Sequence, residues 1–169
     1  MAGIQQLRQK RSGVGLRGWD REQAFDGFTL FTPLAGGDCV YLIDMAGEVV
    51  HTWPTPYPPG LYGCLTETGT LLFNGKTREE SDRFIATGAW KGGALLEMDW
   101  DGRVLWEVNH PDHHHDGIRL RNGNVMLLCM AELPAELAAR VQGGLAGSEH
   151  NGVMHADYLV EMTLTGDVV

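Results

Sequence analysis

The sequence predicts an all-β protein, specifically a β-propeller of four-stranded antiparallel blades, of which about two and a half are present in this chain. Two observations carry this prediction. Two kinds of β-hairpin alternate along the chain at one period, and 23 glycines among 169 residues indicate a chain rich in tight turns. A period of roughly 50 residues with four short strands per unit is typical of propeller blades.

The first kind of hairpin occurs twice, in the segments Leu61 to Phe73 and Ile118 to Met130. Each has a short apolar strand, a tight turn and a buried apolar strand. The turn glycines, Gly69 and Gly123, are 54 positions apart.

The second kind of hairpin occurs three times, in the segments Tyr41 to Trp53, Ala94 to Val108 and Tyr158 to Val169. Its turn glycines are Gly47, Gly102 and Gly166. The first interval, 55 positions, matches the 54 of the other hairpin, whereas the second, 64, leaves room for an insertion. We predict that this insertion is a short helix, Pro134 to Val141, followed by a glycine-rich loop, Gly143 to Gly147.

Residues 1–17 are predicted to form a polar, basic arm, and residues 18–169 the blades. The first strand is expected within Gly27 to Pro33, and a polar loop or short helix within Lys76 to Lys91. Because no apolar stretch of signal-peptide or membrane-spanning length follows the basic start, the sequence predicts a cytoplasmic protein with no membrane partner.

Charge and cysteine content narrow the function classes. A net charge of -9 disfavours nucleic acid as a partner, because binding to phosphates requires basic side chains. Three cysteines, Cys39, Cys64 and Cys129, stand at wide spacings without a zinc-ligand pattern. We predict that they are reduced core residues.

The last hairpin has only the beginning of its second strand, Val168 and Val169. A closed propeller has about 4 to 8 blades, and an open one exposes sheet edges that invite pairing with other chains. We therefore expect either a longer polypeptide, which we favour, or a second chain or self-association that completes the propeller.

The hairpin motifs resemble those of a known family. The segments LLEMDWDGRVLWE (95–107), HHDGIRLRNGNVMLL (114–128) and MHADYLVEM (154–162) are similar to repeats of the bacterial arylsulfotransferases, PAPS-independent enzymes with six-bladed propellers. The resemblance covers nearly the whole chain from about Gly15. It implies transfer of a sulfuryl group from an aryl sulfate to a phenol through a transiently sulfated histidine, with a small aromatic substrate and no cofactor.

By position in these motifs, the resemblance assigns His114, His115 and Asp116 to the catalytic site, together with His155 and Asp157 from the next repeat. Imidazole suits both nucleophilic and acid–base roles because its pKa lies near neutrality. The aspartates would orient the imidazoles. Which histidine takes the sulfuryl group does not follow from the motifs.

Three further residues are candidates for substrate binding. Arg119 alternates with apolar residues, so it projects from one face of a strand. There it would form a structural ion pair or, if that face is the channel, clamp an anion. Tyr62 and Lys76 lie on predicted loops of the first repeat, within reach of a bound aromatic substrate.

Two other hypotheses remain open. Three histidines, His113, His115 and His155, are ligands that a divalent transition metal accepts, and Asp116 could join them. They would serve a metal-dependent lyase or hydrolase on the same scaffold. If the segment were extended, His113 and His115 would share a face opposite His114. The last hypothesis is a non-catalytic half-propeller that acts as a binding module.

Overall fold

The computed structural model describes residues 15–33, 37–77, 92–144, 149 and 152–169. Residues 1–14 of the predicted arm, 78–91 of the predicted loop and 145–147 of the glycine-rich loop lie outside the described residues. The described part contains one short helix, α1 (Ala135–Ala138), and ten strands: β1 (Thr29–Phe31), β2 (Cys39–Ile43), β3 (Val49–Pro54), β4 (Pro59–Leu65), β5 (Leu71–Lys76), β6 (Gly93–Met98), β7 (Val104–Asn109), β8 (His113–Arg119), β9 (Val125–Glu132) and β10 (His155–Met162).

The strands form three antiparallel sheets, in the orders β1-β2-β3, β4-β5-β6-β7 and β10-β9-β8. The all-β architecture is therefore confirmed. Among these three sheets only the second has the four strands that we predicted for a blade. The third has three strands and an isolated bridge between Met162 and Val168, which marks the place of a fourth. None of the three sheets closes on itself.

The predicted repeat is visible in the strand pairing. In the pair β4 and β5, Gly63 lies opposite Phe73, and in the pair β8 and β9, Gly117 lies opposite Leu127, 54 positions later in both strands. The first strand of each pair also has the same bulge. His113 and Gly117, four residues apart in β8, lie opposite Cys129 and Leu127, which are only two residues apart in β9. Pro59 and Gly63 of β4 lie opposite Gly75 and Phe73 of β5 in the same way. The two repeats therefore share an irregular feature as well as a length.

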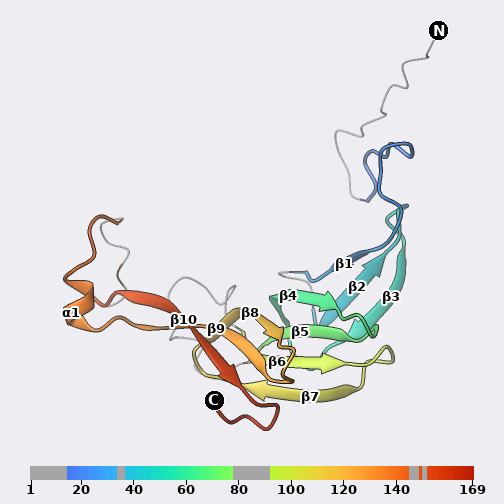
Figure 1. Ribbon diagram of the computed structural model, residues 1–169. Helices are drawn as coiled ribbons and strands as arrows, with labels where there is room; N and C mark the ends of the chain where they lie inside the picture. Colours follow the sequence, from blue (N-terminus) through green and yellow to red (C-terminus); the bar gives the residue numbers. More distant parts are fainter. Residues whose placement is uncertain (1–14, 34–36, 78–91, 145–148, 150–151) are drawn as a thin grey trace.

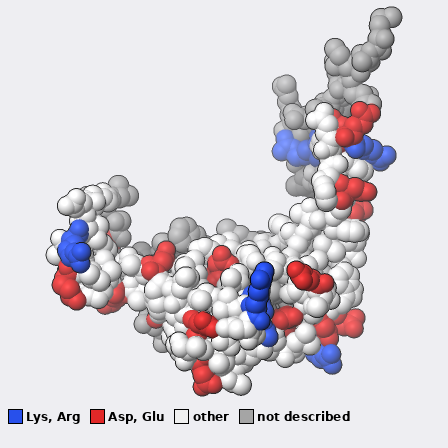
Figure 2. Space-filling model, viewed as in Figure 1, with Lys and Arg blue, Asp and Glu red and all other residues white. Residues whose placement is uncertain are grey.

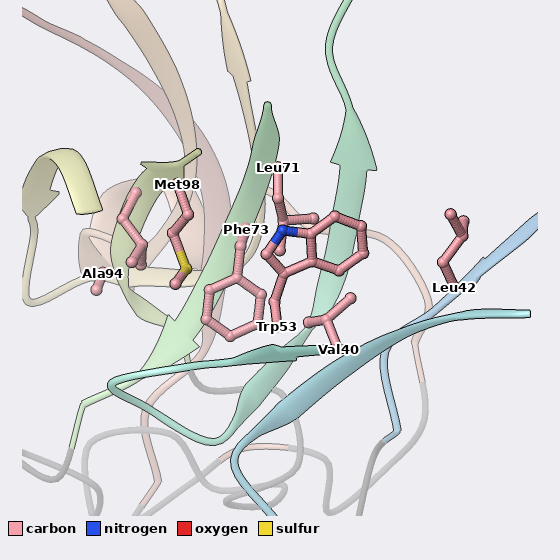
Figure 3. Close-up of a cluster of buried hydrophobic side chains, with 8 residues drawn as sticks. Val40, Leu42, Trp53, Leu71, Phe73, Ala94 and Met98 are labelled. Atoms are coloured by element: carbon pink, nitrogen blue, oxygen red, sulfur yellow. The ribbon is translucent and has the colours of Figure 1, made fainter. Parts of the chain in front are cut away.

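The second sheet lies between the other two and has an apolar core on each face (Figure 1). Because side chains alternate along a strand, Leu71 and Phe73 of β5 project toward the first sheet, where Trp53 packs beside them (Figure 3). Leu72 projects the other way and packs in the core that the second sheet shares with Leu127 and other residues of the third.

The first strand and the hairpin turns lie where the sequence predicts them. β1 falls within Gly27 to Pro33, and the turn glycines Gly69 and Gly123 have φ of 81° and 92°, which glycine adopts without strain. The predicted helix is real but short, because only Ala135–Ala138 are helical after Pro134. Cys129 is buried as predicted, whereas Cys39 and Cys64 are only half-buried; all three are free thiols.

Charge is dispersed over the surface. Acidic side chains are spread along the face seen in Figure 2, with lysine and arginine side chains between them. Within the described residues, no helix combines the length and apolar character needed to cross a bilayer.

The inter-sheet core predicts a sharp contrast between two phenylalanines. Phe73 is fully buried between the first and second sheets, whereas Phe25 is 94% exposed. We expect Phe73→Ala to lower the free energy of unfolding by about 3 to 5 kcal/mol, because it leaves a cavity. Phe25→Ala should change it by less than about 0.5 kcal/mol. Urea unfolding of both variants tests this, and equal effects would contradict the described packing.

Candidate functional site

The histidine cluster lies at the start of β8, inside the bulge. His113 and His114 are buried and His115 is half-buried. The ring of His113 forms a hydrogen bond within the bulge, with Nε2 at 3.1 Å from the backbone oxygen of Asp116. Because a carbonyl oxygen only accepts, Nε2 of His113 carries the proton of this hydrogen bond.

The alternation expected for an extended segment does not hold. The rings of His114 and His115 face each other, with their Nδ1 atoms 2.6 Å apart and their ring centroids 4.6 Å apart. The residues added by the bulge change the direction of successive side chains, so neighbours in sequence become neighbours in space. A hydrogen bond between two ring nitrogens requires that one is protonated and the other is not.

Asp157 reaches the same histidines from β10. Its Oδ1 lies 3.4 Å from Nε2 of His114. The side chain of Asp157 is 63% exposed and that of His114 only 7%, so the pair joins a buried imidazole to a solvated carboxylate. His155, two residues earlier, lies on the same side of β10 and is half-buried. The two predicted motifs therefore meet in space at His114.

Burial disfavours the charged forms of His113 and His114. It lowers the pKa of His113 from 6.5 to about 4, and the carbonyl groups of Asp116 and Gly93 oppose the shift only in part. Burial also lowers the pKa of His114; charge on His115 adds to this effect and Asp157 works against it. Neutral imidazole is the form that acts as a nucleophile or a base.

Tyr62 and Asp116 approach this group where the second and third sheets meet, since β4 packs against β8. The pKa of Tyr62 is raised to about 12, mainly by a hydrogen bond with Cys64, then by burial, and to a lesser extent by the charges of Cys64 and Asp116. Tyr62 is therefore protonated near neutral pH. The charge of Asp116 also raises the pKa of His114, so Asp116 lies near both the tyrosine and the histidine.

The two predicted cations are placed differently. Arg119 has Nη1 at 4.0 Å from Oε2 of Glu97, and its guanidinium lies 5.1 Å from the ring centre of Trp106. This is the ion-pair alternative rather than a contact with the histidines. Lys76 ends β5, and burial lowers its pKa. Among the contacts of the described residues, none joins Lys76 to the histidines.

The described residues contain no group of three His, Cys, Asp or Glu side chains arranged to hold a metal ion. In particular, Nε2 of His113 faces the Asp116 carbonyl. The metal site built from His113, His115 and His155 stays a prediction.

Sequence reasoning missed a second polar group beside the cluster. The hydroxyl of Tyr158 donates to Oδ2 of Asp112 at 2.5 Å, and the backbone N–H of Asp112 donates to Nδ1 of His110 at 3.2 Å. Burial, and then the charge of Asp112, raise the pKa of Cys129 to about 12. The sequence feature that indicates this polar group is that Asp112 directly precedes the three histidines.

Comparison of the chain with models of protein families, with curated proteins and with solved structures finds no match. The family resemblance therefore rests on the sequence motifs alone.

The burial of His113 predicts an acid-sensitive fold. The pKa of His113 is 6.5 in the unfolded chain and about 4 in the folded protein, so at low pH the unfolded state binds more protons. Protonation therefore lowers the free energy of unfolding as the pH falls from 6.5 toward 4, with about 2 kcal/mol lost between pH 7 and pH 5.

Urea unfolding at several pH values measures this loss. In the variant His113→Gln, the fall in stability between pH 7 and pH 5 should shrink by the same amount. An unchanged pH dependence in the variant would show that His113 is not the group responsible.

Proposed function

We propose that this chain carries a sulfuryl-transfer site of the arylsulfotransferase type, on a β-propeller in the cytoplasm. The supporting observation is the continuous line of polar contacts from Asp157 through His114 to His115. A line of this kind orients imidazoles and moves protons between them, which are the two requirements of nucleophilic catalysis by histidine.

The carboxylate at one end assigns the protons along this line. A nearby carboxylate favours a proton on the imidazole nitrogen that faces it, so we assign the hydrogen of His114 to Nε2, which lies 3.4 Å from Oδ1 of Asp157. Nδ1 of His114 then accepts a hydrogen bond from Nδ1–H of His115. This assignment leaves Nε2 of His115 unprotonated, and His115 is half-buried and thus closer to solvent than His114.

In the proposed reaction, Nε2 of His115 attacks the sulfur of an aryl sulfate. The bond between sulfur and the aryl oxygen breaks, and a phenolate leaves. The proton on Nδ1 of His115 passes to Nδ1 of His114, whose positive charge then faces Asp157. The acceptor phenol attacks the sulfur in the second step, the N–S bond breaks, and the proton returns to His115.

His155 is the proposed acid and base for the phenol oxygens, because it lies on the same side of β10 as Asp157. It protonates the leaving phenolate and later takes the proton of the acceptor. Asp116 and Tyr62 flank the histidines on the side of the second sheet and would contact the substrate. Arg119 and Lys76 have no role in this scheme.

We also propose that a further sheet completes the site. On the outer face of the third sheet, which also carries Asp157, Leu159 is 65% exposed, and Ile118 of β8 is 48% exposed. Exposed apolar side chains beside a partly open polar site indicate a covering element. Another part of the polypeptide, a second chain or a second copy would supply it.

The reaction scheme predicts graded losses of activity. His115→Ala should lower kcat for transfer from 4-nitrophenyl sulfate to phenol by at least about 1,000-fold, because the nucleophile is removed. Asp157→Asn should cause a smaller loss, since it only weakens the orientation of His114. The matched control is His51→Ala, whose ring stacks on Trp100 in another part of the protein. Full activity of His115→Ala would exclude this residue as the nucleophile.

Native mass spectrometry of the purified protein tests completion of the sheets and metal content together. We expect a complex with another chain or copy, without bound transition metal. A stoichiometric transition metal would favour the metal-dependent alternative. A metal-free monomer that transfers sulfuryl groups on its own would contradict the proposal that a second chain or copy completes the site.

A further inference from the structure

Asn74 is a polar residue in the apolar interior. Its side chain is fully buried in β5, and among the described residues neither Oδ1 nor Nδ2 has a hydrogen-bond partner. The preceding residues of the strand are apolar, and the position 54 residues later in the repeat is Leu128. A buried amide without partners destabilises the folded state, so an apolar residue would suit the fold better.

The carboxamide points toward the third sheet. In β5, Leu72 packs in the core shared with the third sheet, and Asn74, two residues on, lies on the same side. Across the sheet Asn74 pairs with Leu95. Leu95 in turn touches the β8 bulge, since a Cβ atom at Gly117 would lie 3.0 Å from its Cδ2. Asn74 is therefore next to the end of the bulge that contains the histidines.

A second polar atom without a partner lies on the opposite sheet. Oδ1 of Asp116, the residue before Gly117, is buried and has no hydrogen-bond partner among the described residues. Tyr62 of β4, close enough to feel the charge of Asp116, completes the group. Lys76 lies two residues beyond Asn74 on the same side of β5. Both sheets thus contribute buried polar atoms without partners, Asn74 from the second sheet and Asp116 from the third.

We propose that Asn74 is a substrate-binding residue of the histidine site and that its carboxamide donates hydrogen bonds to the sulfuryl oxygens of an aryl sulfate. This inference rests on the proposed sulfuryl transfer. A neutral amide can remain in the interior at much lower cost than a lysine or arginine, and its N–H groups still stabilise negative charge on oxygen. The destabilising residue would then be retained for its contact with the substrate.

The variant Asn74→Leu tests the inference, because leucine occupies the equivalent position of the other repeat. We expect a higher midpoint of thermal unfolding together with a loss of at least about 10-fold in kcat/KM for 4-nitrophenyl sulfate. The matched control is Leu72→Val on the same side of the strand, which should lower the midpoint and leave kcat/KM within about 2-fold. An Asn74→Leu variant that is more stable and equally active, or one that is less stable, would overturn the inference.

Titration of the wild-type protein with 4-nitrophenyl sulfate separates this inference from the proposed function. The side-chain NH₂ resonance of Asn74, assigned by its loss in Asn74→Leu, should shift as the ligand is added. A shift without turnover would support Asn74 as a binding residue and reject sulfuryl transfer. Turnover without a shift would reject only the role of Asn74, and the absence of both would reject both proposals.

Discussion

The irregular pairing of β8 with β9 is the constraint on which the candidate site depends. Without the bulge, successive side chains of β8 would point to opposite faces, and His114 could not meet His115. Two features hold the bulge in place: the hydrogen bond from His113 to the Asp116 carbonyl, and the missing side chain of Gly117. A Cβ atom there would lie 3.0 Å from Cδ2 of Leu95 in the second sheet and 3.1 Å from Cδ2 of Leu127, so a larger residue would require these side chains to move.

The same bulge occurs in β4, but there it carries other chemistry. The positions equivalent to His113 through Asp116 are Pro59 through Tyr62, which contain no imidazole. The fold therefore supplies the same backbone shape twice, and the residues placed on it decide whether it becomes a site. Burial then lowers the pKa of His113 and of His114, while the side chain of Asp157 remains exposed to solvent. The line of contacts therefore runs from an exposed carboxylate, Asp157, to a buried imidazole, His114.

Much of the fold could be predicted from the sequence, because turn glycines such as Gly69 and Gly123 mark hairpins at a fixed period. The meeting of His114 and Asp157 followed from the family resemblance. The bulge could not be predicted, because its two versions share no residue types before the glycine. The contact of Arg119 with Glu97 depends on packing between sheets, which local patterns do not encode. The sequence does distinguish Asn74, because the equivalent position of the other repeat is Leu128, but only the structure shows that Asn74 is buried.

In the proposed reaction, His115 takes the sulfuryl group, His114 takes the proton of His115, and Asp157 faces the resulting positive charge. The most direct measurement is mass spectrometry of peptides from protein incubated with 4-nitrophenyl sulfate and quenched before an acceptor is added. We expect the added mass of one sulfuryl group on the peptide that contains His115, and no such mass in His115→Ala. A sulfuryl group on another residue, or its persistence in His115→Ala, would contradict the account.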